Sequence, residues 1–370
     1  MTVHEASNQA VISALANYLA PYITEWYGES AVLDSESFTL RRNPYSFFIS
    51  FPVRTSAGMQ TLLVKIHRKP EIRTLADALT TERLQKIARD EYEISQVIWQ
   101  AFAEENSPVC IPVQYLGFIE KWNALLMRRV EGRMLKEYLL RPSIALRNPK
   151  SLAQLQKYLL LSTHWLNILH RRVSGLQIMP FPVEKARLLI EEVLSKLHEW
   201  SNGQVDINPF RAALEQELEG MRDLHVPVGL LHTDFHYSNI LVTPNDQVCV
   251  LDYALNYYGP IYFDLATILI DPETRQVQIL TNGRFIAADF IQSCKRLILN
   301  EYFNGEPYFK NVLNFYCVLA ILNKWSTDEA VFSNRWRKMV SPILSRITRR
   351  YYAKLVLRYL RSFFIDNLLF

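Results

Sequence analysis

The chain has 370 residues, of which 49% are hydrophobic and 21% are charged, which is typical of a globular protein with room for two hydrophobic cores. Its net charge is only +4, it has no run of eighteen apolar residues, and its N-terminus lacks the basic and apolar regions of a signal peptide, so we expect a cytoplasmic protein. The four cysteines lack metal-ligand spacing, which indicates reduced thiols (Cys110, Cys249, Cys294 and Cys317).

The first 67 residues change from a helical to an extended pattern. Apolar residues recur at helical spacing between residues 5 and 26, which predicts an amphipathic helix that Pro21 bends and Gly28 ends. Three β-rich runs follow, separated by turn-forming residues, and they predict strands at 38–40, 47–51 and 60–66.

A lysine and a glutamate in consecutive predicted elements form a candidate pair. Lys65 lies in the third strand, where alternation places it on the opposite face from Val64 and Ile66. Glu91 falls on the apolar face of a helix predicted at 79–102, whereas Glu93 points elsewhere. An acid on an inward face needs a partner, and Lys65 is the candidate. A solvated lysine on a half-exposed strand is the alternative.

The middle of the chain predicts a hairpin and then helices. Strands at 113–119 and 124–128 are joined across a turn, and the chain continues to Gly132. Helical patterns follow at 151–173, 182–202 and 207–223. We interpret His170, near the end of the first of these helices, as a packing histidine rather than a catalytic one.

The stretch 231–252, LHTDFHYSNILVTPNDQVCVLD, carries the residues that say most about function, namely His232, Asp234, Asn239 and Asp252. Its two short apolar runs are separated by a Thr-Pro-Asn-Asp turn, which predicts a β-hairpin. Asp234 and Asn239 precede the first strand and Asp252 follows the second, so the hairpin brings both carboxylates and the amide together. Phosphoryl transfer needs such a cluster, because one carboxylate must orient the attacking hydroxyl while oxygen ligands hold Mg²⁺ on the phosphates.

The run His232-Thr-Asp-Phe-His-Tyr-Ser-Asn-Ile-Leu241 resembles the H-G-D-x-H-x-x-N-x-L motif of the aminoglycoside phosphotransferase-like family. A protein kinase would usually carry Lys at His236 and D-F-G where Asp252-Tyr253-Ala254 stands. Thr233 replaces the usual Gly of the family. Downstream, the stretch from Asn256 to Ala266 is similar to the family's G-D-P-x-x-D-L-A, in which Asp264 would bond the backbone of the catalytic loop.

This resemblance implies roles for the matched positions. Asp234 and Asn239 would be catalytic, with Asp234 orienting the acceptor hydroxyl, and Asn239 and Asp252 would hold Mg²⁺. Lys65, fixed by Glu91, would grip the α- and β-phosphates of ATP.

The resemblance also points to adenine and phosphate contacts. Adenine would meet the backbone of Val130 and the carbonyl of Arg128, although an ordinary strand and turn ending at Gly132 would explain these residues equally. The predicted phosphate loop, 42–46, has no glycine, and its backbone amides and the Ser46 hydroxyl would cover the phosphates.

The C-terminal helix, predicted at 341–365, is basic on one face. Between residues 335 and 361 there are no acids and nine basic residues, namely Arg335, Arg337, Lys338, Arg346, Arg349, Arg350, Lys354, Arg358 and Arg361. Without these nine, the chain has 32 basic and 37 acidic residues. The helix is either a solvated face or a peripheral contact for a membrane or a polyanion. Its charge also speaks against a polycationic aminoglycoside as acceptor.

The resemblance, which spans roughly residues 37 to 270, implies an α+β, bilobal, protein-kinase-like fold. It would comprise an N-terminal helix (1–28), an N-lobe of antiparallel sheet plus helix (29–128), a hinge (129–132) and a mainly helical C-lobe (133–370), with ATP between the lobes. The predicted function is transfer of the γ-phosphoryl group of ATP, with Mg²⁺, to a hydroxyl of a small molecule such as a sugar or glycan precursor. A protein kinase and an inactive nucleotide-binding scaffold are the alternatives, and no nucleic-acid partner is expected.

Overall fold

The computed structural model describes residues 3–144, 149–173, 175–253, 257–333 and 341–366. Ala254 and Asn256 of the motifs above, and the basic residues Arg335, Arg337 and Lys338, lie outside these ranges. The chain forms two compact units. Unit 1 consists of Met1–Gly132 with Thr243–Asn245, and unit 2 of Arg133–Val242 with Asp246–Phe370.

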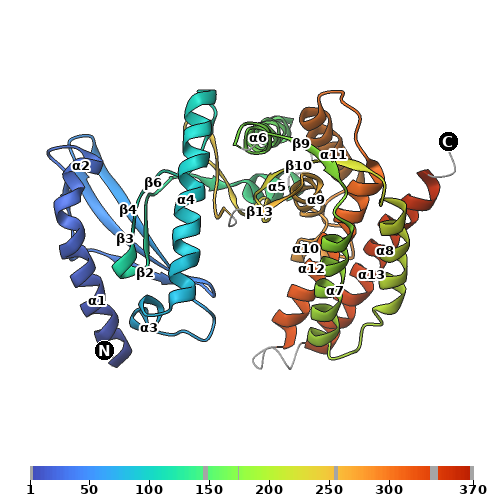
Figure 1. Cartoon of the computed structure of the whole chain (residues 1–370), viewed down its shortest axis with the longest axis horizontal. Helices are drawn as coiled ribbons and strands as arrows, with labels where there is room; N and C mark the ends of the chain where they lie inside the picture. The colour runs from blue at the N-terminus through green and yellow to red at the C-terminus, as the bar shows by residue number, and fades with distance from the viewer. Residues whose placement is uncertain (1–2, 145–148, 174, 254–256, 334–340, 367–370) are drawn as a thin grey trace. The chain divides into compact units, whose positions relative to one another are not determined.

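Unit 1 is built on an antiparallel sheet with the strand order β1-β3-β4-β7-β6, in which β2 also pairs with β3 (Figure 1). Its strands are β1 (Val32–Leu33), β2 (Thr39–Arg42), β3 (Ser46–Thr55), β4 (Gly58–His67), β5 (Cys110–Ile111), β6 (Tyr115–Ile119) and β7 (Ala124–Arg128). Its helices are α1 (Val3–Leu19), α2 (Ile23–Tyr27), α3 (Leu75–Leu79) and α4 (Glu82–Glu105), with 3-10 turns η1 (Ala20–Tyr22) and η2 (Glu120–Trp122).

Alternation along the strands decides what each face of this sheet packs against. Leu62, Val64 and Ile66 of β4 join one buried cluster with Leu15 and Leu19 of α1, so α1 covers one face of the sheet. Helix α4 lies on the other side of the strands (Figure 1). The residues between the three aliphatic ones therefore face α4, as the two-residue period of a strand requires.

Unit 2 is mainly helical and carries two small antiparallel sheets, of order β13-β10-β9 and β12-β11-β8. The strands are β8 (Arg133–Met134), β9 (Gln177–Pro180), β10 (His225–Leu231), β11 (Ile240–Val242), β12 (Val248–Val250) and β13 (Tyr257–Pro260). The helices are α5 (Leu135–Ile144), α6 (Pro149–Ile168), the π-helical η3 (Leu169–Val173), α7 (Val183–Trp200), α8 (Asn208–Gly220), α9 (Tyr262–Ile270), α10 (Gln276–Leu280), α11 (Ala288–Phe303), α12 (Lys310–Ser333) and α13 (Ser341–Asp366).

The predicted elements are present, the break at Pro21 included, and differences occur further along the chain. The N-terminal helix breaks at Pro21 into a 3-10 turn, and Gly28 ends it at a φ of +100°, as expected. The helix predicted at 79–102 begins only at Glu82, because the chain first leaves α3 through Thr80 and Thr81. Strands β9, β10 and β13 were not predicted, since they are held by pairing between segments that lie far apart in the sequence.

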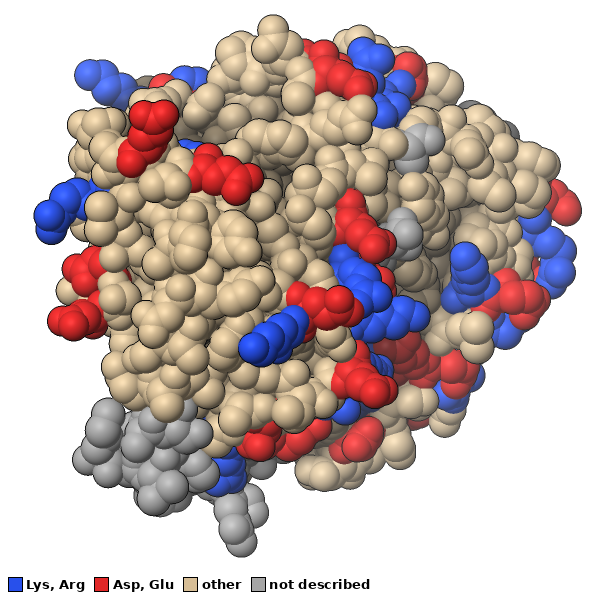
Figure 2. All heavy atoms as spheres, turned by 60° about the vertical axis from the view of Figure 1, so that its left-hand side comes forward, with Lys and Arg blue, Asp and Glu red and all other residues tan. Residues whose placement is uncertain are grey.

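On the face drawn in Figure 2, acidic and basic side chains are interspersed and form no patch of a single charge. Such a mixture keeps the local field weak. Within the described ranges, no helix combines the length and the apolar character needed to cross a membrane. All four cysteines are buried, and none of them forms a disulfide bond.

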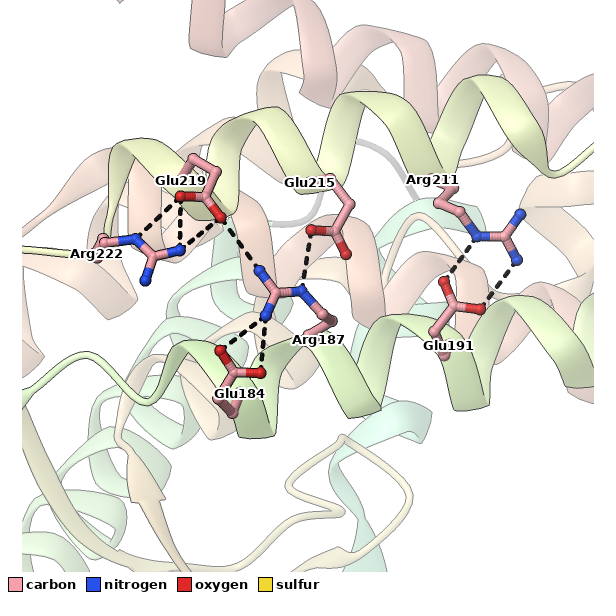
Figure 3. A network of polar contacts seen from close by, with 7 residues as sticks. All are labelled: Glu184, Arg187, Glu191, Arg211, Glu215, Glu219 and Arg222. Atoms are coloured by element: carbon pink, nitrogen blue, oxygen red, sulfur yellow. Dashed lines mark hydrogen bonds and ion pairs between the residues drawn. The ribbon is translucent and has the colours of Figure 1, made fainter.

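Helices α7 and α8 are joined by a network of ion pairs (Figure 3). Arg187 of α7 contacts Glu184 on its own helix, and Glu215 (3.2 Å) and Glu219 (3.1 Å) on α8. Arg211 of α8 binds Glu191 of α7 through two nitrogens, at 2.7 and 3.0 Å. This network fixes one side of α7, and another part of the same helix lines the cavity described below.

Candidate active site

Unit 1 holds a buried ion pair on the α4 side of its sheet. The Lys65 ammonium donates to both carboxylate oxygens of Glu91, at 3.0 and 3.1 Å. The side chains of Lys65 and Glu91 are only 7% and 2% exposed. The structure thus joins the two residues that strand and helix periodicity had paired, and Glu93 is exposed.

Two further side chains complete the shell of Glu91. His67 Nε2 lies 2.8 Å from Glu91 Oε2, and the Tyr115 hydroxyl donates to Glu91 Oε1 at 2.5 Å. The sequence analysis missed both. His67 is two residues after Lys65 on the same strand, and therefore on the same face, so the period-2 pattern carried a signal for it. Tyr115 comes from β6 and offers no local signal.

The three donors settle the charge of Glu91. Burial raises the pKa of its carboxyl, but the Lys65 charge and the His67 hydrogen bond outweigh burial and hold the pKa at about 2. Glu91 is therefore ionised at neutral pH, and it fixes the ammonium of Lys65 in one position. A fixed ammonium is suited to binding phosphate oxygens.

The other predicted contacts of unit 1 lie at strand ends. Arg128 ends β7, and its guanidinium stacks on Tyr27 at 4.7 Å and donates to the Trp26 carbonyl. Val130 follows and is half-buried. Ser46 begins β3 and is buried, with its amide bonded to Asn43 Oδ1 at 2.6 Å. The exposed side chains of this turn are those of residues 41–45, and the nucleotide contacts of Ser46, Val130 and Arg128 remain predictions.

In unit 2, a buried carboxylate supports the catalytic loop from α9. Asp264 is fully buried and accepts the amide of His232 at 2.6 Å and that of Thr233 at 2.7 Å. His170 Nε2 lies 3.1 Å from the same carboxylate, and His170 Nδ1 lies 2.6 Å from the Tyr302 hydroxyl. His170 thus does more than pack, because it orients the carboxylate that positions the loop.

The loop backbone is strained at the position where the resembled family carries glycine. Thr233 has a φ of +65°, a left-handed conformation that costs a β-branched residue on the order of 1–3 kcal/mol. The hydrogen bond from its amide to Asp264 holds this conformation. The loop therefore keeps the backbone that glycine would adopt freely.

The carboxylate of Asp234 lies at the outer side of this loop and is 60% exposed. His236 Nε2 lies 3.3 Å from Asp234 Oδ1, and the Asn239 amide donates to Asp234 Oδ2 at 2.8 Å. Desolvation by the surrounding loop raises the pKa of Asp234, but the contacts with His236, His232 and Asn239 lower it by a larger amount, so the net shift is downward. The buried His232 ring, with its pKa lowered by burial, donates to the Leu251 carbonyl at 2.9 Å.

Asn239 and Asp252 are brought together by the hairpin. The amide of Leu251, the residue before Asp252, donates to the Asn239 carbonyl at 2.8 Å. Asp252 is exposed and has a φ of +56°. Because the Asn239 side-chain nitrogen is used on Asp234, its amide oxygen is left to coordinate a hard cation. This oxygen and the Asp252 carboxylate are the donor types that Mg²⁺ prefers.

The described residues contain no group of three or more His, Cys, Asp or Glu side chains that could hold a metal by themselves. A site of one amide and one carboxylate nevertheless fits Mg²⁺, which is commonly bound by one or two carboxylates together with phosphates and water. The donor set thus fits a cation that arrives with a nucleotide.

A cavity of about 500 Å³ in unit 2 has Asp234 in its wall. It is lined by α7, the catalytic loop, α9 and α12, together with the segment 271–275. Asp271 and Arg275 form an ion pair in this wall, and Arg275 also donates to the Ser238 hydroxyl at 2.9 Å. The volume is that of a site for a small molecule.

Comparison with known proteins gives the family. The model of the phosphotransferase enzyme family matches residues 51–295, whereas no curated protein matches the sequence. A glucosamine kinase in complex with glucosamine, ADP and inorganic phosphate superposes with a TM-score of 0.57 at 12% identity, covering 98% of this chain and 88% of that one.

Two further solved structures are also similar to this chain over most of its length. A putative aminoglycoside phosphotransferase from Ralstonia eutropha has a TM-score of 0.53 at 14% identity, covering 94% of this chain and 98% of that one. An ethanolamine kinase from Plasmodium vivax has a TM-score of 0.52 at 13% identity, covering 93% and 86%. Likeness at such low identity shows the fold, and it confirms the predicted α+β, protein-kinase-like class. Since the family match spans well over half of the residues, the chain belongs to the phosphotransferase enzyme family.

Proposed function

We propose that this enzyme transfers the γ-phosphoryl group of ATP to a hydroxyl group of a small molecule, with Mg²⁺ as cofactor. The observation that carries the proposal is the position of Asp234, an exposed carboxylate held by His236 and Asn239 in the wall of a cavity of about 500 Å³. A carboxylate at a cavity of this size can orient one hydroxyl of a bound molecule.

The cavity lining favours a neutral, hydroxylated acceptor. Glu192 lies 2.5 Å from Lys196, and Asp271 is paired with Arg275. Among the lining residues, which are all described, Asp234 is therefore the one carboxylate without a Lys or Arg partner. The remaining polar lining consists of His236, of Lys324, whose ammonium lies 4.0 Å from Asp328, and of hydroxyl and amide groups. These last groups can bond sugar-like hydroxyls (Thr233, Ser238, Thr267, Thr274, Asn323 and Thr327).

The chemistry assigned to these residues is mainly positioning. The acceptor hydroxyl oxygen forms a bond to the γ-phosphorus, the bond between that phosphorus and the bridging oxygen of ADP breaks, and the hydroxyl proton passes to Asp234. Because its pKa is lowered, Asp234 is a weak base that orients the hydroxyl and receives the proton late. Mg²⁺, held by Asn239 and Asp252, would neutralise phosphate charge when bound.

Unit 1 would bind the nucleotide. Lys65, fixed by Glu91 at 3.0 Å, would hold the α- and β-phosphates, the backbone of Arg128 and Val130 would meet the adenine, and the turn ending at Ser46 would cover the phosphates. The solved glucosamine kinase with ADP has the same fold. We place the reaction in the cytoplasm, where ATP is supplied and four buried cysteines without disulfide bonds stay reduced.

Thermal unfolding with and without MgATP tests the nucleotide site. Wild type should show a magnesium-dependent rise of the midpoint, because a ligand of the native state stabilises it by mass action. Asp252→Asn should lose the magnesium dependence. The matched control, Asp223→Asn, changes an exposed aspartate in the turn that follows α8 and should behave like wild type.

A panel of hydroxylated metabolites with γ-labelled ATP then tests transfer. We expect label in at least one neutral polyol or sugar, and none when Asp234 is replaced by Asn. A wild-type midpoint that does not move at saturating MgATP would contradict the proposal, as would label that appears equally with both proteins.

A further inference from the structure

The outward side of α13 carries a continuous row of cationic and aliphatic side chains. Six exposed residues follow one another at intervals of three or four, which places them on one side of the helix. We call this row the basic stripe, and it consists of Ile343, Arg346, Arg350, Lys354, Leu357 and Arg361. The opposite side of α13 is buried against unit 2 through residues such as Tyr352 and Val356.

The cations of the basic stripe differ from the other cations of α13. Arg349 binds Glu329 at 2.8 Å and Arg358 binds the buried Glu273, so these two arginines attach the helix to its own unit. Within the described ranges, none of the four cations of the stripe has a hydrogen bond or an ion pair. Their charge is therefore not neutralised by the protein itself, and no acidic residue occurs between 335 and 361.

Two of the six side chains of the basic stripe are aliphatic. Ile343 is 70% exposed and Leu357 is 46% exposed. Exposed aliphatics flanked by long cationic side chains are the composition of a helix that lies in a membrane interface, where the aliphatics enter the acyl boundary and the cations meet lipid phosphates. A nucleic acid would be bound by cations and stacking aromatics instead.

Cationic groups continue from α13 onto its neighbours. A hollow of about 330 Å³ beside Arg358 is lined by Lys295, Arg296 and Lys310 of α11 and α12 as well, and no carboxylate is among its lining residues, all of which are described. Lys295 is bound to Glu273, whereas Arg296 and Lys310 have no ion pair among the described residues. The cationic surface is thus wider than the stripe alone.

We propose that the basic stripe of α13 docks this enzyme on an anionic membrane surface. The occupant follows from charge complementarity together with the exposed aliphatics. Each cation near such a surface contributes on the order of a fivefold increase in partitioning, so four cations give binding that is substantial and reversible. Docking would confine the enzyme to the membrane surface without a membrane-spanning helix. The inference is independent of the proposed function.

Vesicle flotation tests the docking. The full chain is mixed with vesicles of phosphatidylcholine alone, or of phosphatidylcholine with about one third phosphatidylglycerol, at low and high salt. Wild type should float only with the anionic vesicles, and less at high salt. The variant Arg346→Gln/Arg350→Gln/Lys354→Gln should bind about a hundredfold more weakly. Leu357→Gln should weaken binding by a few-fold without any change of charge.

The matched control removes the same charge elsewhere. Arg73→Gln/Arg83→Gln/Lys86→Gln changes three exposed cations of unit 1 and should float like wild type. All variants alter exposed side chains, and an unchanged unfolding midpoint and MgATP shift will show that fold and nucleotide site are intact. The proposal is overturned if wild type does not float with anionic vesicles, if both triple variants lose binding equally, or if the protein binds soluble heparin but no vesicle.

Discussion

Two carboxylates of this enzyme occupy opposite environments. Glu91 of unit 1 is 2% exposed and meets Lys65, His67 and Tyr115 from two strands. Asp234 of unit 2 is 60% exposed, and its carboxylate is held by His236 and Asn239 of its own loop. The comparison separates a structural role from a chemical one. The carboxylate of Glu91 is enclosed by its partners and has no room for a reacting group, whereas the exposed, oriented carboxylate of Asp234 can contact one.

Both groups have a lowered pKa, for different reasons. At Glu91 burial raises the pKa, and the Lys65 charge together with the contacts of His67 and Tyr115 lowers it by more, so the stability of the fold depends on these buried contacts. At Asp234 the shift comes from His236 and from further hydrogen bonding within the loop. We therefore expect substitution of Glu91 to cost stability, and substitution of Asp234 to cost chemistry.

Replacement of Asp234 by Asn should have the largest effect. The exposed side chain contributes little to folding, so the free energy of unfolding should change by no more than about 0.5 kcal/mol. The rate of phosphoryl transfer should fall about a thousandfold, because the variant can no longer accept the hydroxyl proton. Transfer of label from γ-labelled ATP measures this rate, and urea unfolding measures the stability.

Asp223→Asn is the control for this experiment, since it makes the same chemical change on an exposed aspartate outside the loop, in the turn before β10. If the Asp234→Asn variant transfers phosphoryl groups at the wild-type rate, this carboxylate does not accept the hydroxyl proton. A variant at Asp234 that unfolds at a much lower urea concentration would instead show that Asp234 stabilises the fold, as Glu91 does.

Replacement of Glu91 by Leu should cost about 3–5 kcal/mol of folding free energy, because it leaves the Lys65 ammonium buried without a counter-charge. The double variant Lys65→Met/Glu91→Leu should regain most of this loss, and it should still fail to show the MgATP shift. Urea unfolding of the complete double-mutant cycle gives the coupling energy.

The control here is Glu93→Leu, two residues along the same helix and exposed, which should stay within about 0.5 kcal/mol of wild type. If the double variant is no more stable than Glu91→Leu, the loss lies in the contacts with His67 and Tyr115 rather than in the unpaired ammonium.

The same comparison shows what the sequence could predict. The contact of Lys65 with Glu91 could be predicted because strand and helix periods are local and fix which side chains face inward. The turn-forming residues of the hairpin likewise predict that Asn239 and Asp252 lie close together, and the roles of Asp234, Asn239 and Asp252 stay predictions from the motif. The two-residue period extends to His67, but no short-range pattern indicates Tyr115, which reaches Glu91 across 24 residues of chain.

The cavity beside Asp234 could not be predicted at all. Its wall combines α7, α9 and α12, which are widely separated in the sequence. Their packing depends on many non-local contacts, and no spacing of residues encodes it. The ion pairs of Glu192 with Lys196 and of Asp271 with Arg275 are local, four residues apart. What the sequence does not show is that both pairs lie in the wall of one cavity.

Acid pH should weaken the fold through Glu91. Its pKa in the folded protein is about 2, against an ordinary value of 4.5, so its contribution to stability is complete above about pH 4.5 and is lost as the pH falls towards 2. The loss is on the order of 3 kcal/mol. Urea unfolding between pH 5 and about pH 2.5 should show this decline in wild type, and a smaller one in Glu91→Gln. Equal slopes in the two proteins would assign the acid sensitivity to other carboxyl groups.

The smallest effect is expected in the ion-pair network of α7 and α8. Arg187 contacts three glutamates, but its side chain is 33% exposed and two of the three glutamates are more than half exposed, so water and salt screen the pairs. Arg187→Ala should therefore cost only about 0.5–1 kcal/mol at low salt, and less at high salt. Lys185→Ala, an exposed change on the same helix without a charged partner among the described residues, is the control for urea unfolding. A loss above about 2 kcal/mol that persists at high salt would show that the network acts like the buried shell of Glu91, and that exposure alone does not separate the two kinds of carboxylate.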